Sequence, residues 1–378
     1  MNSVANETVE FELPYFKEPH WLEIVRLTLE FFIAALGIVG NAVVCLVITF
    51  QPQMQTVINF YIRNLAIADL GILLFSFPLT VIKEQDPYHW PLGEYFCRFL
   101  YPVNDIFYGA SVWSITLIAI DRYRAIVGGR IPKRNSLNFR SARWMILGVW
   151  IMSFLVISLP LYFVMTFIDQ NSYIDCTPIW PSAERGNLGE MQQIYSIAII
   201  VFWYVLPLTI IVGTFHSISV KLRVSTNFNR SIQEECNKSS ESHNARSNPT
   251  HARKRLRERQ NSRAKKLLTP VVIVFAVTML PVNVFRLSVM YWEGISKHKY
   301  LWVFYNVCVI FIIANSSANF FIYSLVSDEF RQSFKRLICR NSNPTSRSTT
   351  DRTVRSPLHS PLNLSPTNLY PTNTDRQE

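Results

Sequence analysis

Seven apolar stretches, each long enough to cross a lipid bilayer, constrain this chain more than any other feature. They are Ile24–Phe50, Val57–Ile82, Phe96–Ile126, Ala142–Ile168, Met191–Leu222, Ala264–Trp292 and Tyr300–Val326. About 20 apolar residues in a helix span the roughly 30 Å hydrocarbon core. Only 17% of the chain is charged, whereas 49% is hydrophobic. The sequence therefore predicts an all-α membrane protein, with a seven-transmembrane helix bundle over residues 24–326.

The distribution of Lys and Arg predicts the orientation of this bundle. Basic residues gather after the third and fifth stretches and again in the tail, as at Arg124, Arg255 and Arg331. The amino-terminal segment, residues 1–23, is acidic. Because cytoplasmic loops carry the excess of Lys and Arg, we expect an extracellular amino terminus and a cytoplasmic carboxy terminus at the plasma membrane. The net charge of +11 then reflects orientation beside anionic lipid and does not indicate a nucleic-acid partner.

Two segments outside the apolar stretches are strongly polar. Residues from about 224 to 261 are basic and rich in Ser and Asn, and residues 341–378 are rich in Ser, Thr and Pro. Neither can bury enough apolar area to offset its ordering entropy, so both are predicted to be disordered. Residues 327–340 predict an amphipathic eighth helix, in which Cys339 is a candidate for palmitoylation. On the outer side, Asn6 begins a glycosylation sequon.

A set of polar residues falls near mid-membrane inside the apolar stretches. It consists of Asn41, Asp69, Ser111, Asn315 and Asn319. An unpaired carboxylate at this depth is heavily penalised, so these side chains are expected to converge in the bundle interior. Their hard oxygen atoms suit a sodium ion, with Asp69, Ser111 and Asn315 as its ligands. A water-filled polar network without an ion is the alternative.

The tripeptide Asp121-Arg122-Tyr123 stands where the third stretch runs into a basic loop. Ionisable residues at the edge of a membrane helix are functional candidates by default. Pro207 and Pro281 each remove a helix hydrogen bond and predict kinks in the fifth and sixth helices. Cys97 and Cys176 both lie in outer loops, where an oxidising compartment favours a disulfide between them.

In this register the chain resembles the rhodopsin-like (class A) G-protein-coupled receptors, and receptors for neuropeptides most of all. The likeness runs from about Gly37 to Cys339. One set of matching residues falls in each stretch: Gly40-Asn41; Leu65–Asp69; Cys97 and Asp121–Tyr123; Trp150 and Pro160; Pro207; Phe275 and Pro281; Asn315, Asn319 and Tyr323. The resemblance implies a cell-surface receptor, not an enzyme, that binds an extracellular ligand and activates a heterotrimeric G protein. It also implies arrestin and receptor kinases as partners of a phosphorylated tail.

The same resemblance implies roles for individual residues. The expected activation and coupling switch comprises Asp121, Arg122, Tyr123, Phe275, Pro281, Asn319 and Tyr323. In this family, sodium at the mid-membrane site stabilises the inactive state. Several residues depart from the family pattern: Thr278, Met279, Phe320, Phe215, Asn261 and Gly129-Arg130. These departures leave the predicted fold unchanged but bear on the activation equilibrium and on basal activity.

The ligand is predicted from the outer halves of the helices. Asn104 occupies the position of the aspartate that amine receptors use, which disfavours a monoamine. The candidate pocket residues are Tyr101, Asn104, Asp105, Tyr108, Trp203 and Arg286. Outer acidic residues favour a basic peptide through steering, whereas Arg286 could clamp a carboxylate. The segment Tyr173–Ile179 suits a hairpin anchored at Cys176, as in peptide receptors.

Other functions stay open at this point. A lipid, nucleotide or other small ligand would use Arg286 as its anchor, and an orphan receptor with atypical coupling fits the departures at Met279, Phe320 and Gly129. A secondary transporter is the remote alternative. It predicts internal repeats and a path of mid-membrane charges, whereas this chain shows no repeat and has mid-membrane acids only at Asp69 and Asp105.

Overall fold

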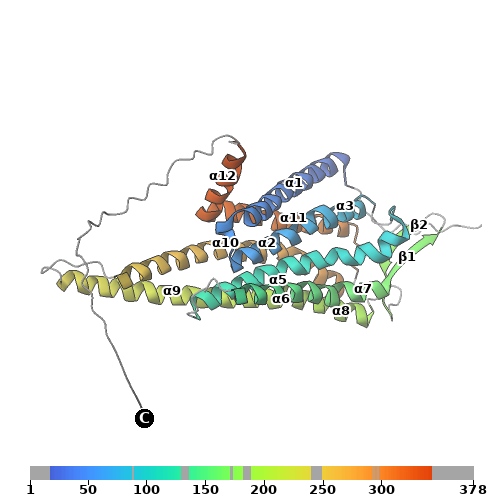
Figure 1. Ribbon diagram of the computed structural model, residues 1–378. Coiled ribbons are helices and arrows are strands. Elements are labelled where there is room, and N and C mark those ends of the chain that lie inside the picture. The colour runs from blue at the N-terminus through green and yellow to red at the C-terminus, as the bar shows by residue number, and fades with distance from the viewer. Residues whose placement is uncertain are drawn as a thin grey trace, which may run out of the picture.

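The computed structural model is a bundle of seven membrane-length helices, with a β-hairpin at one end and a short helix, α12, at the other (Figure 1). The structure describes residues 18–86, 89–128, 136–170, 173–181, 189–239, 249–292, 294–295 and 298–342. Side chains are described throughout these ranges except at 136–138, 170, 173, 225–239, 249–268 and 340–342.

The helices of the bundle follow the predicted apolar stretches. Their described spans are His20–Phe50, Val57–Gln85, Gly93–Ile126, Phe139–Val164, Glu190–Val224, Thr269–Tyr291 and Leu301–Val326, all long and apolar enough to cross a membrane. The elements are α1 (His20–Phe50), α2 (Val57–Gly71), α3 (Phe77–Gln85), α4 (Gly93–Tyr95), α5 (Tyr101–Ile126), α6 (Ser136–Ser153), α7 (Leu159–Val164), α8 (Glu190–Ile200), α9 (Leu206–Ser239), α10 (Pro249–Tyr291), α11 (Leu301–Val326) and α12 (Asp328–Ser342). The predicted seven-helix fold and its eighth helix are confirmed.

Prolines explain why several spans are divided into two helices. Each π-helical turn of the described chain is followed at once by a residue and then a proline: Ile72–Ser76 by Pro78, Phe96–Leu100 by Pro102, Phe154–Ser158 by Pro160 and Val201–Val205 by Pro207. Proline has no N–H to donate and its ring clashes with the carbonyl four residues earlier, so the preceding turn widens. The fifth span therefore has its π-helical turn just before Pro207, where the sequence predicts a kink.

A β-hairpin replaces the predicted end of the fourth helix. That stretch was expected to stay helical to Ile168, but the helix ends at Val164 and β1 (Met165–Gln170) pairs antiparallel with β2 (Tyr173–Pro178). Thr166, Phe167 and Ile168 are residues that favour strands, and pairing with β2 satisfies their backbone groups. The predicted hairpin around Cys176 is confirmed, with Phe167 opposite Cys176 in the register.

The prediction of a disordered segment over about 224–261 is wrong for most of that range. The helix α9 continues to Ser239, and α10 already begins at Pro249. Glu, Gln, Lys and Arg are good helix formers, and extending an existing helix is easier than starting one. Residues 240–248 and the predicted disordered tail from residue 343 lie outside the described residues.

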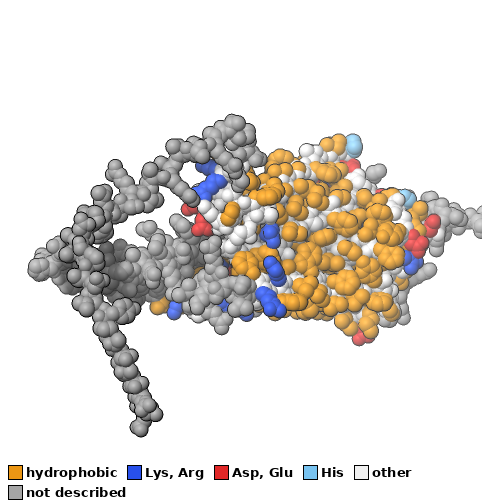
Figure 2. All heavy atoms as spheres, in the orientation of Figure 1, with side chains coloured by type: hydrophobic (Ala, Val, Ile, Leu, Met, Phe, Trp, Pro, Cys, Tyr) orange, Lys and Arg blue, Asp and Glu red, His pale blue; other side chains and the backbone are white. Residues whose placement is uncertain are grey.

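The bundle buries its polar interior and turns apolar side chains outward. Large hydrophobic residues such as Phe163, Leu325 and Phe32 are 81%, 74% and 61% exposed. Figure 2 shows a broad orange belt of hydrophobic side chains over the middle of the bundle, with Lys and Arg along its edge on the side of α12. Such a belt matches the hydrocarbon layer of a bilayer.

Candidate functional site

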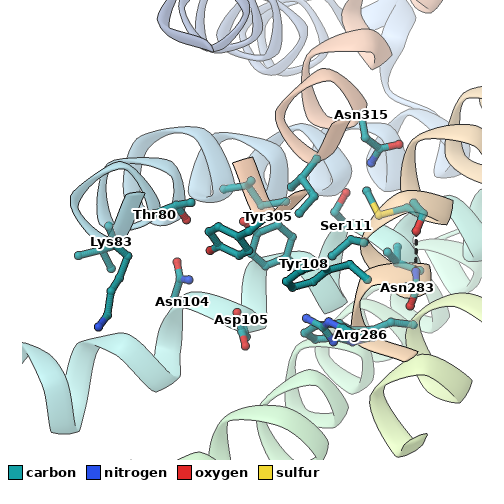
Figure 3. Close-up of a pocket in the computed structure, with 18 of the residues that line it drawn as sticks. Thr80, Lys83, Asn104, Asp105, Tyr108, Ser111, Asn283, Arg286, Tyr305 and Asn315 are labelled. Atoms are coloured by element: carbon teal, nitrogen blue, oxygen red, sulfur yellow. Dashed lines mark hydrogen bonds between the residues drawn. The ribbon is translucent and has the colours of Figure 1, made fainter. Parts of the chain in front are cut away.

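A cavity opens among the outer halves of the helices, below the hairpin. Its volume is 240 Å³, and α3, α5, the fifth span, α10 and α11 supply its walls. The lining includes every residue predicted for the ligand pocket: Tyr101, Asn104, Asp105, Tyr108, Trp203 and Arg286. Figure 3 shows side chains from several helices pointing into one space. A concave site with apolar walls and a few convergent polar groups is the usual form of a ligand pocket.

Aromatic rings form much of the cavity wall. Tyr108 and Trp203 face each other from α5 and the fifth span, with ring centroids 6.4 Å apart. Tyr305 adds a third ring from α11. Tyr305 was not predicted for the pocket, although its aromatic side chain near the start of the seventh stretch was visible in the sequence. Rings of this kind supply large contact area with little loss of side-chain freedom.

Charges of both signs reach the cavity. The guanidinium of Arg286 lies 5.7 Å from the centre of the Trp203 ring. Asp105 interacts electrostatically with Arg286, and Figure 3 shows their two end groups beside each other below Tyr108. Among the described residues, Arg286 forms no salt bridge within 4.0 Å. The cavity therefore presents a cation and an anion to a ligand.

Further residues that were not predicted for the pocket complete the lining. Asn283 and Met279 line the same side as Arg286, and the spacing of Met279, Asn283 and Arg286 places them on one face of α10. Thr80 and Lys83 come from successive turns of α3. The helical spacing from Arg286 was the sequence signal that could have pointed to Met279 and Asn283.

The hairpin is fixed to the outer end of the bundle by a covalent bond and an ion pair. Cys97 and Cys176 form the predicted disulfide, with Cα atoms 5.6 Å apart. Lys83 Nζ lies 2.5 Å from Asp175 Oδ1 and so ties α3 to β2. The buried Trp90 donates its backbone N–H to Ile174 O at 2.7 Å. The hairpin thus lies over the cavity in a defined position.

A second polar centre lies deeper, around Asp69. The carboxylate is fully buried, and Ser111 Oγ donates to its Oδ1 at 2.8 Å while Asn319 Nδ2 donates to its Oδ2 at 2.8 Å. Asn41 and Asn315 are also buried, as predicted, but their hydrogen bonds run elsewhere. Asn41 Nδ2 donates to the Gly37 and Ser316 carbonyls, and Asn315 Oδ1 accepts from Thr278 Oγ1 at 3.0 Å. The predicted set is thus buried in the bundle interior, and Ser111 and Asn319 are the two of its members that bond Asp69 directly.

At the opposite end of the bundle, Asp121 and Arg122, from the tripeptide singled out in the sequence, form an ion pair. Arg122 Nη2 lies 2.5 Å from Asp121 Oδ2, and both side chains are partly exposed. Tyr323 and Phe275 are buried in the largest apolar cluster of the described residues. The predicted switch residues are therefore spread along the bundle: Phe275 packs against Tyr204 with ring centroids 6.2 Å apart, and Pro281 lies in α10 between Met279 and Val282, which line the cavity.

Comparison with known proteins identifies the family. The 7 transmembrane receptor (rhodopsin family) pattern matches residues 40–323. The chain is 31% identical to somatostatin receptor type 5 of Bos taurus, over 84% of this chain and 76% of that receptor. It is 28% identical to the substance-K receptor of Rattus norvegicus over 85% and 75%, and 29% identical to the neuropeptide F receptor of Drosophila melanogaster over 81% and 60%.

This chain belongs to the rhodopsin family of seven-transmembrane receptors. It is therefore a multi-pass membrane protein, and the prediction of a receptor that is not an enzyme is confirmed by its family. The departures from the rhodopsin-family pattern have definite places in the structure. Met279 lines the cavity, Thr278 bonds Asn315, and Phe320 packs against Phe330 at a centroid distance of 6.4 Å.

The remaining predictions concern sites away from these centres. Cys339 is exposed on α12, a position that a lipid chain could reach. Asn6 and the departure at Gly129-Arg130 lie outside the described residues. Asn261 is part of α10, in the range where only the backbone is described.

Proposed function

We propose that this protein is a plasma-membrane receptor that binds an extracellular neuropeptide in the cavity below the hairpin and activates a heterotrimeric G protein at its inner end. The observation that carries the proposal is the cavity, which combines aromatic walls with the charged side chains of Arg286, Lys83 and Asp105 beneath a disulfide-anchored hairpin. The similar receptors named for substance K, somatostatin and neuropeptide F support a peptide as the ligand class.

The charges of the cavity support a peptide that carries both a basic and an acidic or carbonyl group. Arg286 is placed to receive an anionic or carbonyl oxygen, and Asp105 a basic group. Binding of such a ligand activates the receptor only if its affinity is higher for the active state than for the inactive one. Asn104 lines the cavity at the position where amine receptors carry an aspartate, so a peptide fits this pocket better than a small amine.

Asp69 supports sodium as an allosteric ligand. The carboxylate is fully buried and accepts two hydrogen bonds from neutral groups, and none of the described ion pairs supplies it with a positive charge. A sodium ion would supply that charge, with Ser111 and Asp69 as its first ligands and Asn315 on the adjacent turn of α11. The oxygen-rich set of donors suits the ion.

The inner end and the tail are the parts of the receptor that would meet intracellular partners. The amino terminus is extracellular and the carboxy terminus cytoplasmic, as the basic segments indicate. Arg122 would leave Asp121 to meet the G protein in the active state. Phosphorylation of the Ser- and Thr-rich tail by receptor kinases would create acidic sites for arrestin, and palmitoylation of Cys339 would hold α12 on the membrane.

A G-protein dissociation assay tests the proposed function. Cells expressing the receptor are measured first without ligand and then with a neuropeptide library, with surface expression checked in parallel. A saturable response to one peptide is the expected result. A response instead to an anionic lipid or a nucleotide, lost in Arg286→Gln, would replace the peptide by the small-ligand alternative that Arg286 supports.

A further inference from the structure

A buried charged cluster lies at the outer end of the bundle and apart from the ligand cavity. Arg26 of α1 lies at its centre and contacts three glutamates. Its Nε is 3.0 Å from Glu18 Oε2, and its Nη1 is 3.2 Å from Glu30 Oε1 and 2.6 Å from Glu84 Oε2. None of these four residues lines the cavity. The cluster joins the chain before α1, α1 itself and α3 in one contact.

The charges of this cluster do not balance. Three carboxylates against one guanidinium leave two negative charges in excess if every group is ionised. Glu30 is fully buried, and Glu84 is only 4% exposed. An uncompensated charge at such depth is expensive, and a buried carboxyl group commonly takes up a proton instead.

The hydrogen bonds of the two buried glutamates are incomplete. Glu30 Oε2 and Glu84 Oε1 are buried and have no donor. Both carboxyl groups contact the same nitrogen of Arg26 through their other oxygens, and the two lie within hydrogen-bonding reach of each other. One proton between them would supply the absent donor and remove one of the two excess charges.

Other occupants fit less well. Among the described residues, no group of three or more His, Cys, Asp or Glu is placed to hold a metal ion. The neighbouring cation on α3, Lys83, contacts Asp175 in the hairpin. From α11, Asn306 donates its Nδ2 to Glu18 Oε1 at 3.1 Å, and Tyr305 interacts electrostatically with Glu84. Within the part of the chain that the structure describes, the ion pairs of the cluster bring no positive charge other than Arg26.

We propose that Glu30 and Glu84 form a proton-binding site in which the two carboxyl groups share one proton, and that this proton stabilises the contact between α1, α3 and α11. The proton comes from the outer solvent and returns to it. Because the unfolded chain's glutamates are ionised at neutral pH, the folded receptor binds one more proton than the unfolded one. Stability is then greatest in mild acid and falls as the pH rises.

Thermal unfolding of the purified full-length receptor tests the site. The melting temperature is measured at about pH 6 and about pH 8.5 for the wild type, for Glu30→Gln and for Glu94→Gln as the control. Glu94 forms an exposed ion pair with Arg98, 2.7 Å long. The wild type and the control should each lose about 2–4 °C on the shift to alkaline pH. The melting temperature of Glu30→Gln should be the same at both pH values, because the introduced amide would donate to Glu84 at either pH.

A spectroscopic measurement separates proton binding from general stability. The infrared difference between the two pH values should show the carbonyl stretch of a protonated carboxylic acid in the wild type and the control, and its loss in Glu30→Gln. Glu84→Gln tests the same pair from α3, should Glu30→Gln fail to fold. An equal pH dependence of wild type and both Gln variants, or a wild type that gains stability at alkaline pH, would overturn the proposal.

Discussion

The outer and inner ends of the bundle are held together in different ways. At the outer end, the Cys97–Cys176 disulfide, the Lys83–Asp175 ion pair and the Arg26 cluster each join separate elements. At the inner end, the ion pairs of the described residues join neighbours within one helix, as between Asp121 and Arg122. Apolar packing around Tyr323 and Phe330 supplies most of the contact between helices there, beside one hydrogen bond from Arg336 to Gln53.

This difference indicates which end can move. Ion pairs and disulfides fix partners and directions, whereas apolar packing is non-directional and can be exchanged for other apolar packing. A receptor must keep its ligand pocket while opening a site for its partner. The outer end is therefore suited to remain a preformed pocket, and the inner end is suited to separate when Arg122 leaves Asp121.

The largest effect is expected at the inner end. Arg122→Ala should reduce ligand-stimulated G-protein dissociation by more than about 100-fold. The reason is that loss of the charged contact that the G protein would bury costs about 3 kcal/mol. Surface expression should stay near the wild-type value, since the pair with Asp121 lies within α5. Arg124→Ala, two residues on and exposed, is the control. Full signalling by Arg122→Ala would contradict the role of this residue.

The disulfide tests the outer end. Cys97→Ala and Cys176→Ala should each destabilise the receptor by about 2–5 kcal/mol, seen as lower surface expression and weaker ligand binding. The double variant should be no worse than either single one, because one bond is lost in all three. Cys45→Ala, half-buried on α1, serves as control. Additive losses would show that the two cysteines act separately.

A smaller effect is expected within the cavity. Arg286→Gln should weaken binding of a peptide agonist about 10- to 100-fold, since a hydrogen bond from a charged donor contributes about 1.5–3 kcal/mol. Charge reversal in Arg286→Glu should weaken it further. Competition binding measures both, with Lys299→Gln as a control at an exposed cation. Unchanged affinity in both variants would exclude Arg286 from the ligand contact.

The smallest effect concerns the centre of the bundle. Asp69→Asn keeps the size of the side chain but removes its charge, so agonist affinity should no longer fall when sodium is added. The wild type should show a fall of several-fold, which corresponds to about 1 kcal/mol of coupling. Ser158→Ala, buried away from Asp69 with its hydroxyl on Pro102 O at 2.5 Å, is the control. Retained sodium sensitivity in Asp69→Asn would favour the ion-free network.

The fold was predictable from the sequence because lipid leaves few solutions. A membrane segment must satisfy its own backbone, so each apolar stretch of sufficient length becomes a helix. The ends of the helices were less predictable. The fourth helix stops at Val164 because Met165–Gln170 finds a strand partner in Tyr173–Pro178, and such a partner is not visible from hydropathy. The extension of α9 to Ser239 was missed because polar composition was given more weight than helix propensity.

The site was predictable in part for a similar reason. Residues such as Asp105, Tyr108 and Arg286 are conspicuous on their own helices, and all line the cavity. The partner of each residue depends on the packing of distant segments. The pairing of Arg26 with Glu84, 58 residues away, was not foreseen, and neither was the bond from Thr278 to Asn315. Charge patterns along a chain show which residues need partners but do not show which partner they find.

Phe320 stands where the rhodopsin-like pattern has a proline, and its packing limits any exchange of this residue for proline. The Phe320 ring fills the space beside Gly40, where an added Cβ would lie 2.5 Å from it. It also meets Phe330 at the start of α12. Phe320→Pro alone would leave a void between three helices, while a larger residue at position 40 would be tolerated only after the ring is gone. A side chain at position 40 and an aromatic ring at position 320 therefore exclude each other in this packing.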